Sequence, residues 1–271
     1  MRFTPDDAAP GLSTCREDGV LRLRFERPER RNALTRAMMG RLIDHVEGAV
    51  DDPALRVIVL EGEGEHFCSG ADLQDVNARQ AVKPRVGDIQ RRVPRQAHRL
   101  IPALLEVQLP VVSVVRGVAG GIGAHLAFAS DFIVAARSTR FVEPFVSRGF
   151  TPDSGGTFLL TRLVGLARAR RVVLLGEEID AETAARWEIV HAVVPDEELA
   201  SKSESLVARL RDAPTVALGL SKLMMNRAFD VTAQEALSNE AFALELSSRS
   251  RDFKEGMAAF AEKRAPNYRG D

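Results

Sequence analysis

Two glycine-bearing turns, each between an apolar run and a helix-like segment, constrain the fold of this chain more than any other feature. The first turn, residues 66–73 (HFCSGADL), follows the apolar run 57–60, and the second, residues 117–125 (GVAGGIGAH), follows the run 110–115. Glycine allows a positive φ and a close approach of the main chain to a ligand. The first N–H groups of a helix have no internal partner, and the helix dipole favours negative charge there. If the turns lie side by side, two backbone N–H groups can stabilise one developing oxyanion.

The order of the apolar patterns predicts an α/β region followed by a helical one. Residues 20–25 alternate apolar side chains with arginines, as a half-buried strand does, and Thr35 is a candidate N-cap for a helix that continues to Val50. Short continuous apolar runs are typical of strands covered on both faces, here at residues 57–60, 111–115 and 132–135. After about Asp196 every segment has helical periodicity. We therefore expect a core over residues 1–196 and a helical region over residues 197–271.

Charge and composition exclude several classes of function. A formal charge of −1 and a pI near 6.6 are unlike those of a general nucleic-acid binder or a protein of anionic membranes. No apolar run approaches the ~20 residues of a membrane span, and the acidic N-terminus is unlike a signal peptide. Two cysteines, Cys15 and Cys68, are too few for a disulfide framework or a cysteine zinc site. We expect a cytoplasmic protein with no metal and with no nucleic-acid or membrane partner.

Four segments in a fixed order make the chain resemble the crotonase (enoyl-CoA hydratase/isomerase) superfamily. Besides the two turns, they are residues 27–34 (RPERRNAL) and 152–157 (PDSGGT), and the ending 254–257 (KEGM) also fits. The resemblance covers nearly the whole chain. It implies a crotonase-type spiral of ββα turns with a C-terminal helical trimerisation region, hence a homotrimer or a homohexamer. It also implies an acyl-CoA substrate, whose coenzyme A is part of the substrate, so that no separate cofactor is expected.

The resemblance assigns the residues that would bind the thioester. The backbone N–H groups of Ala71 and Gly121 would form the oxyanion hole for the thioester carbonyl. Asp72, which follows Ala71, is expected to brace the turn by side-chain hydrogen bonds rather than to do chemistry. The remaining coenzyme A contacts would come from Arg30 and Arg31 near the phosphates, and from Phe260 and Lys263 of a neighbouring subunit.

The chain departs from the family at the two catalytic glutamates of the hydratases. The corresponding positions hold His125 and Phe145, so two-glutamate hydration is not expected. His125 can act as an acid or a base near neutral pH, or it can be a neutral core residue with one backbone hydrogen bond. Phe145 is expected to form a wall of the acyl pocket, and the nearby Glu143 is a reserve base.

Asp153 is the leading catalytic candidate. It precedes a glycine pair and a helix-like segment, so one interpretation makes it only an N-cap. However, ring-processing enoyl-CoA isomerases of the phenylacetate pathway, which are similar at residues 149–156, use this aspartate as acid and base. The 4-chlorobenzoyl-CoA dehalogenases have a nucleophilic aspartate there and a histidine at the position of His98. Apolar neighbours such as Phe150 would raise the pKa of Asp153 and suit it to proton transfer.

These residues favour one function and leave others open. We expect a double-bond isomerisation through an enolate, with Asp153 as acid and base, because isomerisation does not require water to be placed and activated. The first alternatives are a hydratase or another lyase with an atypical site that uses His125. A nucleophilic dehalogenase or thioesterase would use Asp153 and His98. The last alternative is a non-catalytic acyl-CoA binder.

Overall fold

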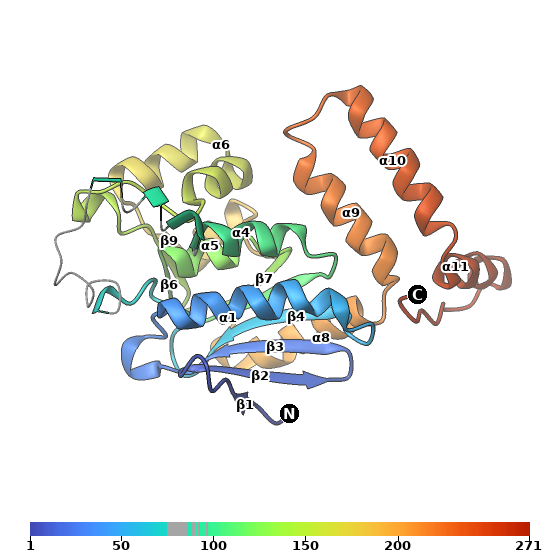
Figure 1. Ribbon diagram of the computed structural model, residues 1–271, viewed down its shortest axis with the longest axis horizontal. Helices are drawn as coiled ribbons and strands as arrows, with labels where there is room; N and C mark the ends of the chain where they lie inside the picture. The colour runs from blue at the N-terminus through green and yellow to red at the C-terminus, as the bar shows by residue number, and fades with distance from the viewer. Residues whose placement is uncertain (75–85, 88–89, 92, 96) are drawn as a thin grey trace.

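The computed structural model describes residues 1–74, 86–87, 90–91, 93–95 and 97–271, and its centre is a largely parallel sheet. Seven strands follow the order β1-β2-β3-β4-β5-β7-β10, with antiparallel pairing only among the first three (Figure 1). The bounds of these strands are β1 Thr4–Pro5, β2 Leu12–Glu17, β3 Val20–Phe25, β4 Val57–Gly62, β5 Val111–Val115, β7 Phe132–Ala136 and β10 Ala192–Val194. A small second sheet has the order β6-β8-β9 and contains β6 Val118–Gly120, β8 Arg140–Val142 and β9 Ile179–Asp180.

Helices cover both faces of the large sheet. They are α1 Arg36–Glu47, α4 Ala97–Glu106, α5 Ile122–Phe128, α6 Gly156–Leu175, α7 Ala181–Arg186, α8 Leu199–Arg211, α9 Thr215–Arg227, α10 Ala233–Ser247 and α11 Arg251–Glu262. Short 3-10 turns lie at η1 Pro28–Arg30, η2 Gly48–Asp51, η3 Val93–Arg95, η4 Val146–Arg148 and η5 Asp196–Glu198. The predicted change to an all-helical chain after about residue 196 agrees with this order.

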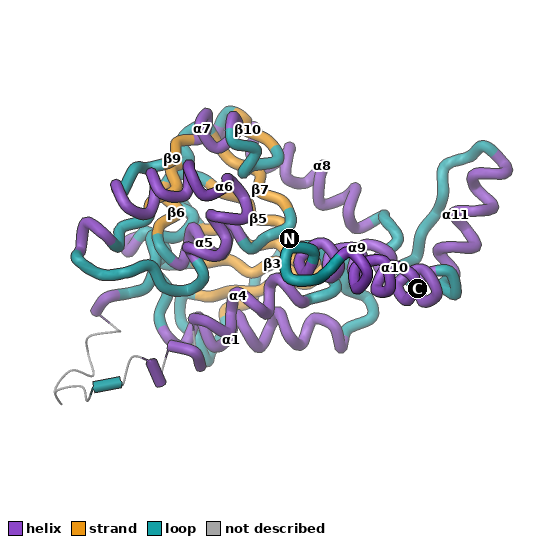
Figure 2. Tube along the Cα trace, turned by 90° about the horizontal axis from the view of Figure 1, so that it is seen from above, coloured by secondary structure: helices purple, strands orange, loops and turns teal. Residues whose placement is uncertain are grey.

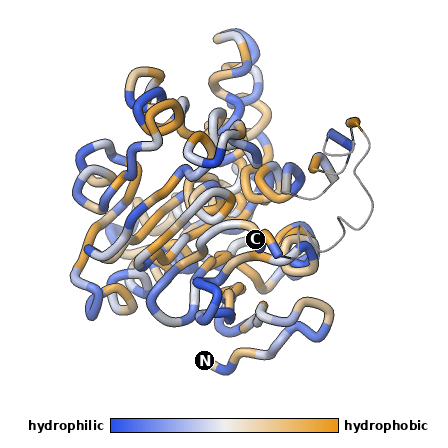
Figure 3. The backbone as a smooth tube through the Cα atoms, turned by 90° about the vertical axis from the view of Figure 1, so that its left-hand side faces the viewer, coloured by the Kyte–Doolittle hydropathy of each residue, from blue (hydrophilic) through white to orange (hydrophobic). Residues whose placement is uncertain are grey.

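The apolar strands are buried on both faces because each face meets different helices. In β4, Ile58 and Leu60 pack in the core with α1 and α4, whereas Val57 and Val59 pack on the opposite face with the apolar side of α8. Figure 3 shows apolar stretches of chain in the interior of the molecule. The first helix after the boundary therefore covers the sheet and completes the core of the spiral.

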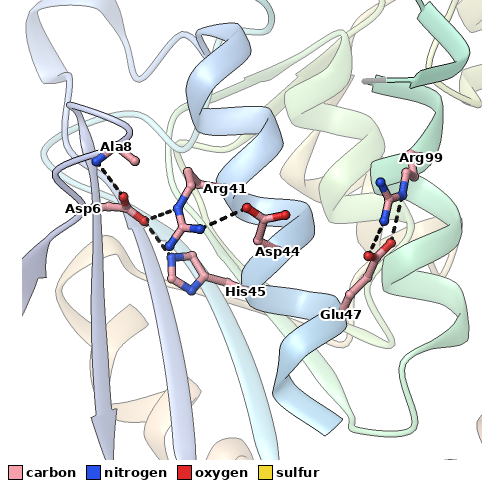
Figure 4. A network of polar contacts seen from close by, with 7 residues as sticks. All are labelled: Asp6, Ala8, Arg41, Asp44, His45, Glu47 and Arg99. Carbon is pink, nitrogen blue, oxygen red and sulfur yellow. Dashed lines mark hydrogen bonds and ion pairs between the residues drawn. The ribbon is translucent and has the colours of Figure 1, made fainter. Parts of the chain in front are cut away.

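Two polar networks fasten the N-terminal segment and α4 to α1 (Figure 4). Thr35 caps α1, as predicted, by accepting a hydrogen bond from the backbone N–H of Met38. Asp6 accepts hydrogen bonds from Arg41 Nε at 2.9 Å and from His45 Nε2 at 2.8 Å. Burial alone would raise the pKa of Asp6, but the hydrogen bonds from His45 and Arg41 outweigh it and lower that pKa. A second network joins Glu47 of α1 to Arg99 of α4.

The C-terminal helices extend from the core in sequence order. Lys222 of α9 is buried and donates to Asp131 Oδ2 at 2.8 Å and to the carbonyl of Leu109 at 3.0 Å. Burial lowers the pKa of Lys222 and raises that of Asp131. Helix α10 packs on α9, and α11 lies at the end of the molecule away from α5 and α6 (Figures 1 and 2). Both helices expose large apolar side chains, among them Phe242 at 72% and Phe260 at 84%. No helix in the described part of the chain is long and apolar enough to cross a membrane.

Candidate active site

The two glycine turns lie side by side and are joined by main-chain hydrogen bonds. The N–H of Cys68 donates to the carbonyl of Val118 at 3.1 Å, and the N–H of Gly120 donates to the carbonyl of Cys68 at 2.8 Å. Glycine is needed where the turns touch. A Cβ at Gly123 would lie 2.3 Å from the carbonyl oxygen of Cys68, and one at Gly70 would lie 3.0 Å from that of Gly120. The sequence pattern therefore predicted this juxtaposition correctly.

The backbone direction of Ala71 leaves its N–H group available to a ligand. On either side of it, the N–H of Leu34 donates to the carbonyl of Gly70 and the N–H of Asp72 donates to the carbonyl of Leu34, both at 2.8 Å. Ala71 pairs with Leu34 as an isolated bridge between these bonds, so its own N–H faces the opposite side. Among the described residues this N–H has no acceptor.

A salt bridge and a local hydrogen bond brace the same turn. The carboxylate of Asp72 accepts from Arg27 at 2.8 Å and from the N–H of Gln74 at 3.0 Å, as expected of a bracing residue. Cys68 is fully buried behind the turn, and burial raises the pKa of its thiol to about 12. This cysteine is therefore not a nucleophile near neutral pH.

The N–H of Gly121 was predicted to be the donor of the second turn, but in the structure it already has an acceptor. This N–H donates to the carbonyl of Val142 at 2.9 Å, because the pairing of β6 with β8 continues past Gly120. Gly121 instead turns the chain, with φ +49° and ψ −123°, and Ile122 begins α5. The N–H of Ile122 is the first of that helix and has no intrahelical acceptor. In the described structure it makes no other hydrogen bond, so the N–H groups that these two turns leave available to a ligand are those of Ala71 and Ile122.

His125 forms a buried pair with Glu143. The side chain of His125 has no exposed surface, and its Nε2 lies 2.9 Å and 3.2 Å from the two carboxylate oxygens of Glu143. Nδ1 of the same ring is buried and has no partner among the described residues. Of the two sequence interpretations of His125, the neutral residue with a backbone partner is wrong, because the partner is a carboxylate from the residue that follows β8.

Phe145 is part of the wall between this pair and the second turn. Its ring stacks on His125 with centroids 5.9 Å apart and meets Phe150 edge-on at 5.3 Å. A Cβ at Gly121 would lie 3.6 Å from the Phe145 ring. Phe145 therefore packs between His125 and the second turn, and its role as a wall of the acyl pocket stays a prediction. A hydrocarbon at this position cannot transfer protons.

Asp153 presents an exposed carboxylate at the start of the turn before α6. Its Oδ1 accepts a hydrogen bond from Ser154 Oγ at 2.8 Å. The N-cap of α6 is Gly155, in the left-handed conformation, so the interpretation of Asp153 as the helix cap is wrong. The carbonyl of Asp153 accepts from the N–H of Gly156 at 3.2 Å, and a Cβ at Gly156 would lie 2.4 Å from His125 Nε2. One tight turn therefore separates the Asp153 carboxylate from the buried pair.

His98 is exposed in the first turn of α4. Ile101, one turn further along α4, lies next to the turn before α6, since a Cβ at Gly155 would lie 3.5 Å from the Cγ2 of Ile101. In the described structure no hydrogen bond joins His98 to Asp153.

The expected coenzyme A residues divide into two groups. Arg30 and Arg31 are exposed beside the first turn, where the carbonyl of Arg31 accepts from the N–H of Ser69 at 2.9 Å. Phe260 and Lys263 are exposed at the end of α11, far from α5 and α6 of the same chain (Figure 2). Their contact with a site therefore requires a second copy of the chain. Within the described residues no group of His, Cys, Asp and Glu side chains can hold a metal ion.

Comparison with known proteins gives consistent matches along the chain. The family described as "Enoyl-CoA hydratase/isomerase" matches residues 15–271. The 1,2-epoxyphenylacetyl-CoA isomerase of Escherichia coli (strain K12) is 39% identical, with 94% of this chain and 96% of that protein covered. The crotonyl-CoA hydratase of Syntrophomonas wolfei is 34% identical, with coverages of 93% and 95%. The crystal structure of a putative enoyl-CoA hydratase from Streptomyces coelicolor A3(2) has a TM-score of 0.91 and 32% identity, and covers 99% of this chain and 97% of that one.

Proposed function

Because this chain belongs to the enoyl-CoA hydratase/isomerase family, within the crotonase superfamily, we propose that it shifts a double bond in an acyl-CoA thioester through an enolate. The single observation that carries the proposal is the placement of the carboxylates. Asp153 is exposed in the turn before α6, whose Gly156 lies against His125 of α5, whereas Glu143 is buried against His125. An exposed carboxylate can reach a substrate carbon, and a buried, hydrogen-bonded one cannot reach it without rearrangement.

In this mechanism the backbone and Asp153 have separate tasks. The N–H groups of Ala71 and Ile122 hold the thioester oxygen, and they hold it more tightly as negative charge develops there. Asp153 removes a proton from the substrate carbon, and the electron pair of the broken C–H bond moves into the enolate. A proton then returns to a different carbon and leaves the double bond shifted. The oxyanion hole is preorganised because three main-chain hydrogen bonds fix the turn around Ala71 and the small sheet fixes the start of α5.

Hydration is less well supported by this geometry. It requires a polar group that binds and activates a water molecule near the acyl group. Phe145 has no such group, and the Nε2 of His125 is engaged by Glu143 away from solvent. Hydration remains the second candidate because relatives such as the Syntrophomonas wolfei protein are named hydratases and His125 lies near the second turn.

The proposal extends to the substrate and the assembly. Phe145 and Phe150 form an aromatic wall, and the Escherichia coli relative is named for a phenylacetyl thioester, so an acyl group with a ring is the preferred class. We place the coenzyme A phosphates near Arg30 and Arg31. The exposed apolar faces of α10 and α11 fit a homotrimer or a homohexamer in which Phe260 and Lys263 complete a neighbour's site in the cytoplasm.

A panel of straight-chain and ring-bearing enoyl-CoA thioesters, followed by mass spectrometry in heavy water, tests the proposal. Isomerisation adds deuterium without adding the mass of water, hydration adds one heavy water, and nucleophilic chemistry releases free coenzyme A or halide. We expect deuterium incorporation and a shifted double bond. A product that carries added water as the main outcome would replace isomerisation by hydration, and inertness toward all thioesters would leave an acyl-CoA binder.

A further inference from the structure

The turn that carries Asp153 has a backbone conformation that its sequence does not favour. The carbonyl of Asp153 accepts a hydrogen bond from the N–H of Gly156 at 3.2 Å, so these residues close a four-residue turn. Both central residues have a positive φ, +51° at Ser154 and +83° at Gly155, which is the signature of a type I′ turn. Asn, Asp and Gly are the residues that such a turn prefers at its centre. Serine at the first central position is therefore an exception that requires a reason.

Ser154 holds a strained conformation in the folded protein. A residue with a Cβ rarely adopts a positive φ, because the Cβ then lies too close to a backbone carbonyl oxygen. Glycine has no such contact and would fit this position of the turn without strain. Backbone strain that persists in a native structure is a reason to look for a function of the side chain that imposes it.

The hydroxyl group of Ser154 has one hydrogen-bond partner in the described structure. Its Oγ donates to Oδ1 of Asp153 at 2.8 Å. Ser154 is only 2% exposed, so water does not readily replace this acceptor, and a buried hydroxyl without a partner is costly. Asp153 itself is exposed. One oxygen of an exposed carboxylate is therefore held by a buried group, and among the described residues the other oxygen, Oδ2, has no hydrogen bond.

The glycines that follow Ser154 fix the turn against two helices. A Cβ at Gly155 would lie 3.5 Å from Cγ2 of Ile101 in α4, and one at Gly156 would lie 2.4 Å from Nε2 of His125 in α5. Helix α5 begins directly after the second glycine turn. The hydrogen bond from Ser154 therefore holds the Asp153 carboxylate relative to a closely packed part of the molecule.

We propose that Ser154 is the residue that positions the catalytic base; this inference rests on the proposed function. Its hydroxyl holds Oδ1 of Asp153 and directs Oδ2 towards the substrate carbon. Oδ2 takes up the proton, the electron pair of the broken C–H bond moves into the enolate, and the Ser154 hydroxyl keeps its own hydrogen. Transfer of the proton from Oδ2 to the second carbon restores the carboxylate. A general base must be held within reach of its proton, and a displacement of about 1 Å can cost on the order of 10²-fold in rate.

Two substitutions of Ser154 separate the role of the hydroxyl from that of the backbone strain. Ser154→Gly removes the hydroxyl and the strain, whereas Ser154→Ala removes the hydroxyl and keeps the strained Cβ. Both are assayed with an enoyl-CoA that the wild-type protein isomerises. We expect kcat to fall by about 10–100-fold in both variants, with little change in KM, because Ser154 is buried and acts on the substrate only through Asp153. Ser154→Gly should nevertheless unfold about 2–4 °C above Ser154→Ala.

Ser147→Ala is the matched control for loss of a serine hydroxyl. Ser147 is exposed in η4, and its Oγ donates to the carbonyl of Pro144 at 3.0 Å. This variant should keep the wild-type kcat and KM. A second measurement uses the same enoyl-CoA deuterated at the carbon that loses its proton. Since Ser154→Gly slows proton removal itself, its isotope effect on kcat should be at least as large as that of the wild-type protein.

Failure of this inference is distinct from failure of the proposed function. A folded Ser154→Gly variant with wild-type kcat would overturn the positioning role, as would an isotope effect smaller than that of the wild-type protein. A loss of kcat confined to Ser154→Ala would assign the effect to the backbone and would also overturn it. If Asp153→Asn isomerises at the wild-type rate, or the wild-type protein isomerises no thioester, the proposed function itself fails and Ser154 has no base to position.

Discussion

Replacement of Ile122 by proline tests the corrected oxyanion hole, because it removes one N–H group at a position where proline suits the backbone. Ile122 is the first residue of α5, and proline is favoured at the first helical position since that N–H has no intrahelical acceptor. The preceding Gly121 has ψ −123°, outside the helical region that a following proline disfavours. The variant should therefore keep α5 while it loses one of two donors to the thioester oxygen.

The expected magnitude follows from the number of donors. Loss of one preorganised donor lowers kcat by about 10²–10³-fold, or about 2.7–4 kcal/mol of transition-state stabilisation. Ile122 is 3% exposed, so loss of its side chain also costs folding free energy, about 2–5 kcal/mol by comparison with isoleucine-to-alanine changes in cores. These effects are separable, because the first acts on turnover and the second on unfolding.

Ile122→Ala is the matched control, since it truncates the same side chain and keeps the N–H. Steady-state kinetics with an isomerised thioester and thermal unfolding are measured for both variants. We expect similar melting temperatures, and a kcat for the proline variant lower than that of the alanine variant by about 10²-fold or more. Equal turnover of the two folded variants would refute the assignment of this donor.

Three further expectations concern stability and one concerns assembly. Lys222→Met should lower the free energy of unfolding in urea by about 1–3 kcal/mol, since it leaves the partly buried carboxylate of Asp131 without its cation. Lys222→Met with Asp131→Asn should recover part of this loss, and a single-variant cost below ~1 kcal/mol would contradict it. Folding lowers the pKa of Asp6. The Asp6 carboxylate therefore contributes to stability at a pH above its unfolded pKa of ~3.9, and this contribution is lost as the pH falls through its folded pKa. Asp6→Asn should remove this contribution, so the urea midpoint of the variant should fall less than that of the wild-type protein as the pH is lowered from 7. Identical midpoint profiles for the two proteins would contradict it. Gly156→Ala would place a Cβ 2.4 Å from the His125 ring and should cost about 1–3 kcal/mol of stability together with most of the activity; a fully active variant would contradict the contact. Static light scattering at micromolar concentration should give the mass of a trimer or a hexamer, and a monomer would contradict the proposed assembly.

The parts of the site that depend on local chain geometry could be predicted from the sequence. Glycine at positions that need a positive φ or a close contact, such as Gly121 and Gly123, marks the turns without knowledge of the rest of the fold. Likewise, continuous apolar runs such as 57–60 indicate strands covered on both faces. The order of these signals was sufficient to predict an α/β fold, and the crotonase-type spiral followed from the resemblance of four segments to the family.

The errors arose where a long-range contact decides the role of a residue. Which N–H of the second turn is available depends on how far β6 pairs with β8, and pairing with Val142 engages Gly121 rather than Ile122. Likewise, Asp153 has the side chain of a good N-cap, but the left-handed Gly155 begins α6 two residues later. Neither the pairing register nor the helix start has a distinct signal in the single sequence.

The pairing of His125 with Glu143 was also not predicted, although both residues were candidates. His125 was interpreted as an acid or base, or as a core residue with a backbone partner, and Glu143 as a reserve base, so neither interpretation named the other residue. Their separation of 18 positions gave no information about contact, because parallel strands β6 and β8 must first place α5 next to the end of β8. The two residues could therefore be recognised as partners only once the fold was known.

The most direct test of the central claim measures proton exchange by Asp153→Asn in heavy water. Asn preserves the shape of the side chain and an acceptor for Ser154 Oγ, but it cannot take up a proton at neutral pH. Wild-type protein should incorporate deuterium into an enoyl-CoA and shift its double bond, whereas the Asn variant should bind the thioester with nearly unchanged affinity and do neither. A folded Asn variant that exchanges and isomerises at the wild-type rate would contradict the assignment of Asp153 as the base.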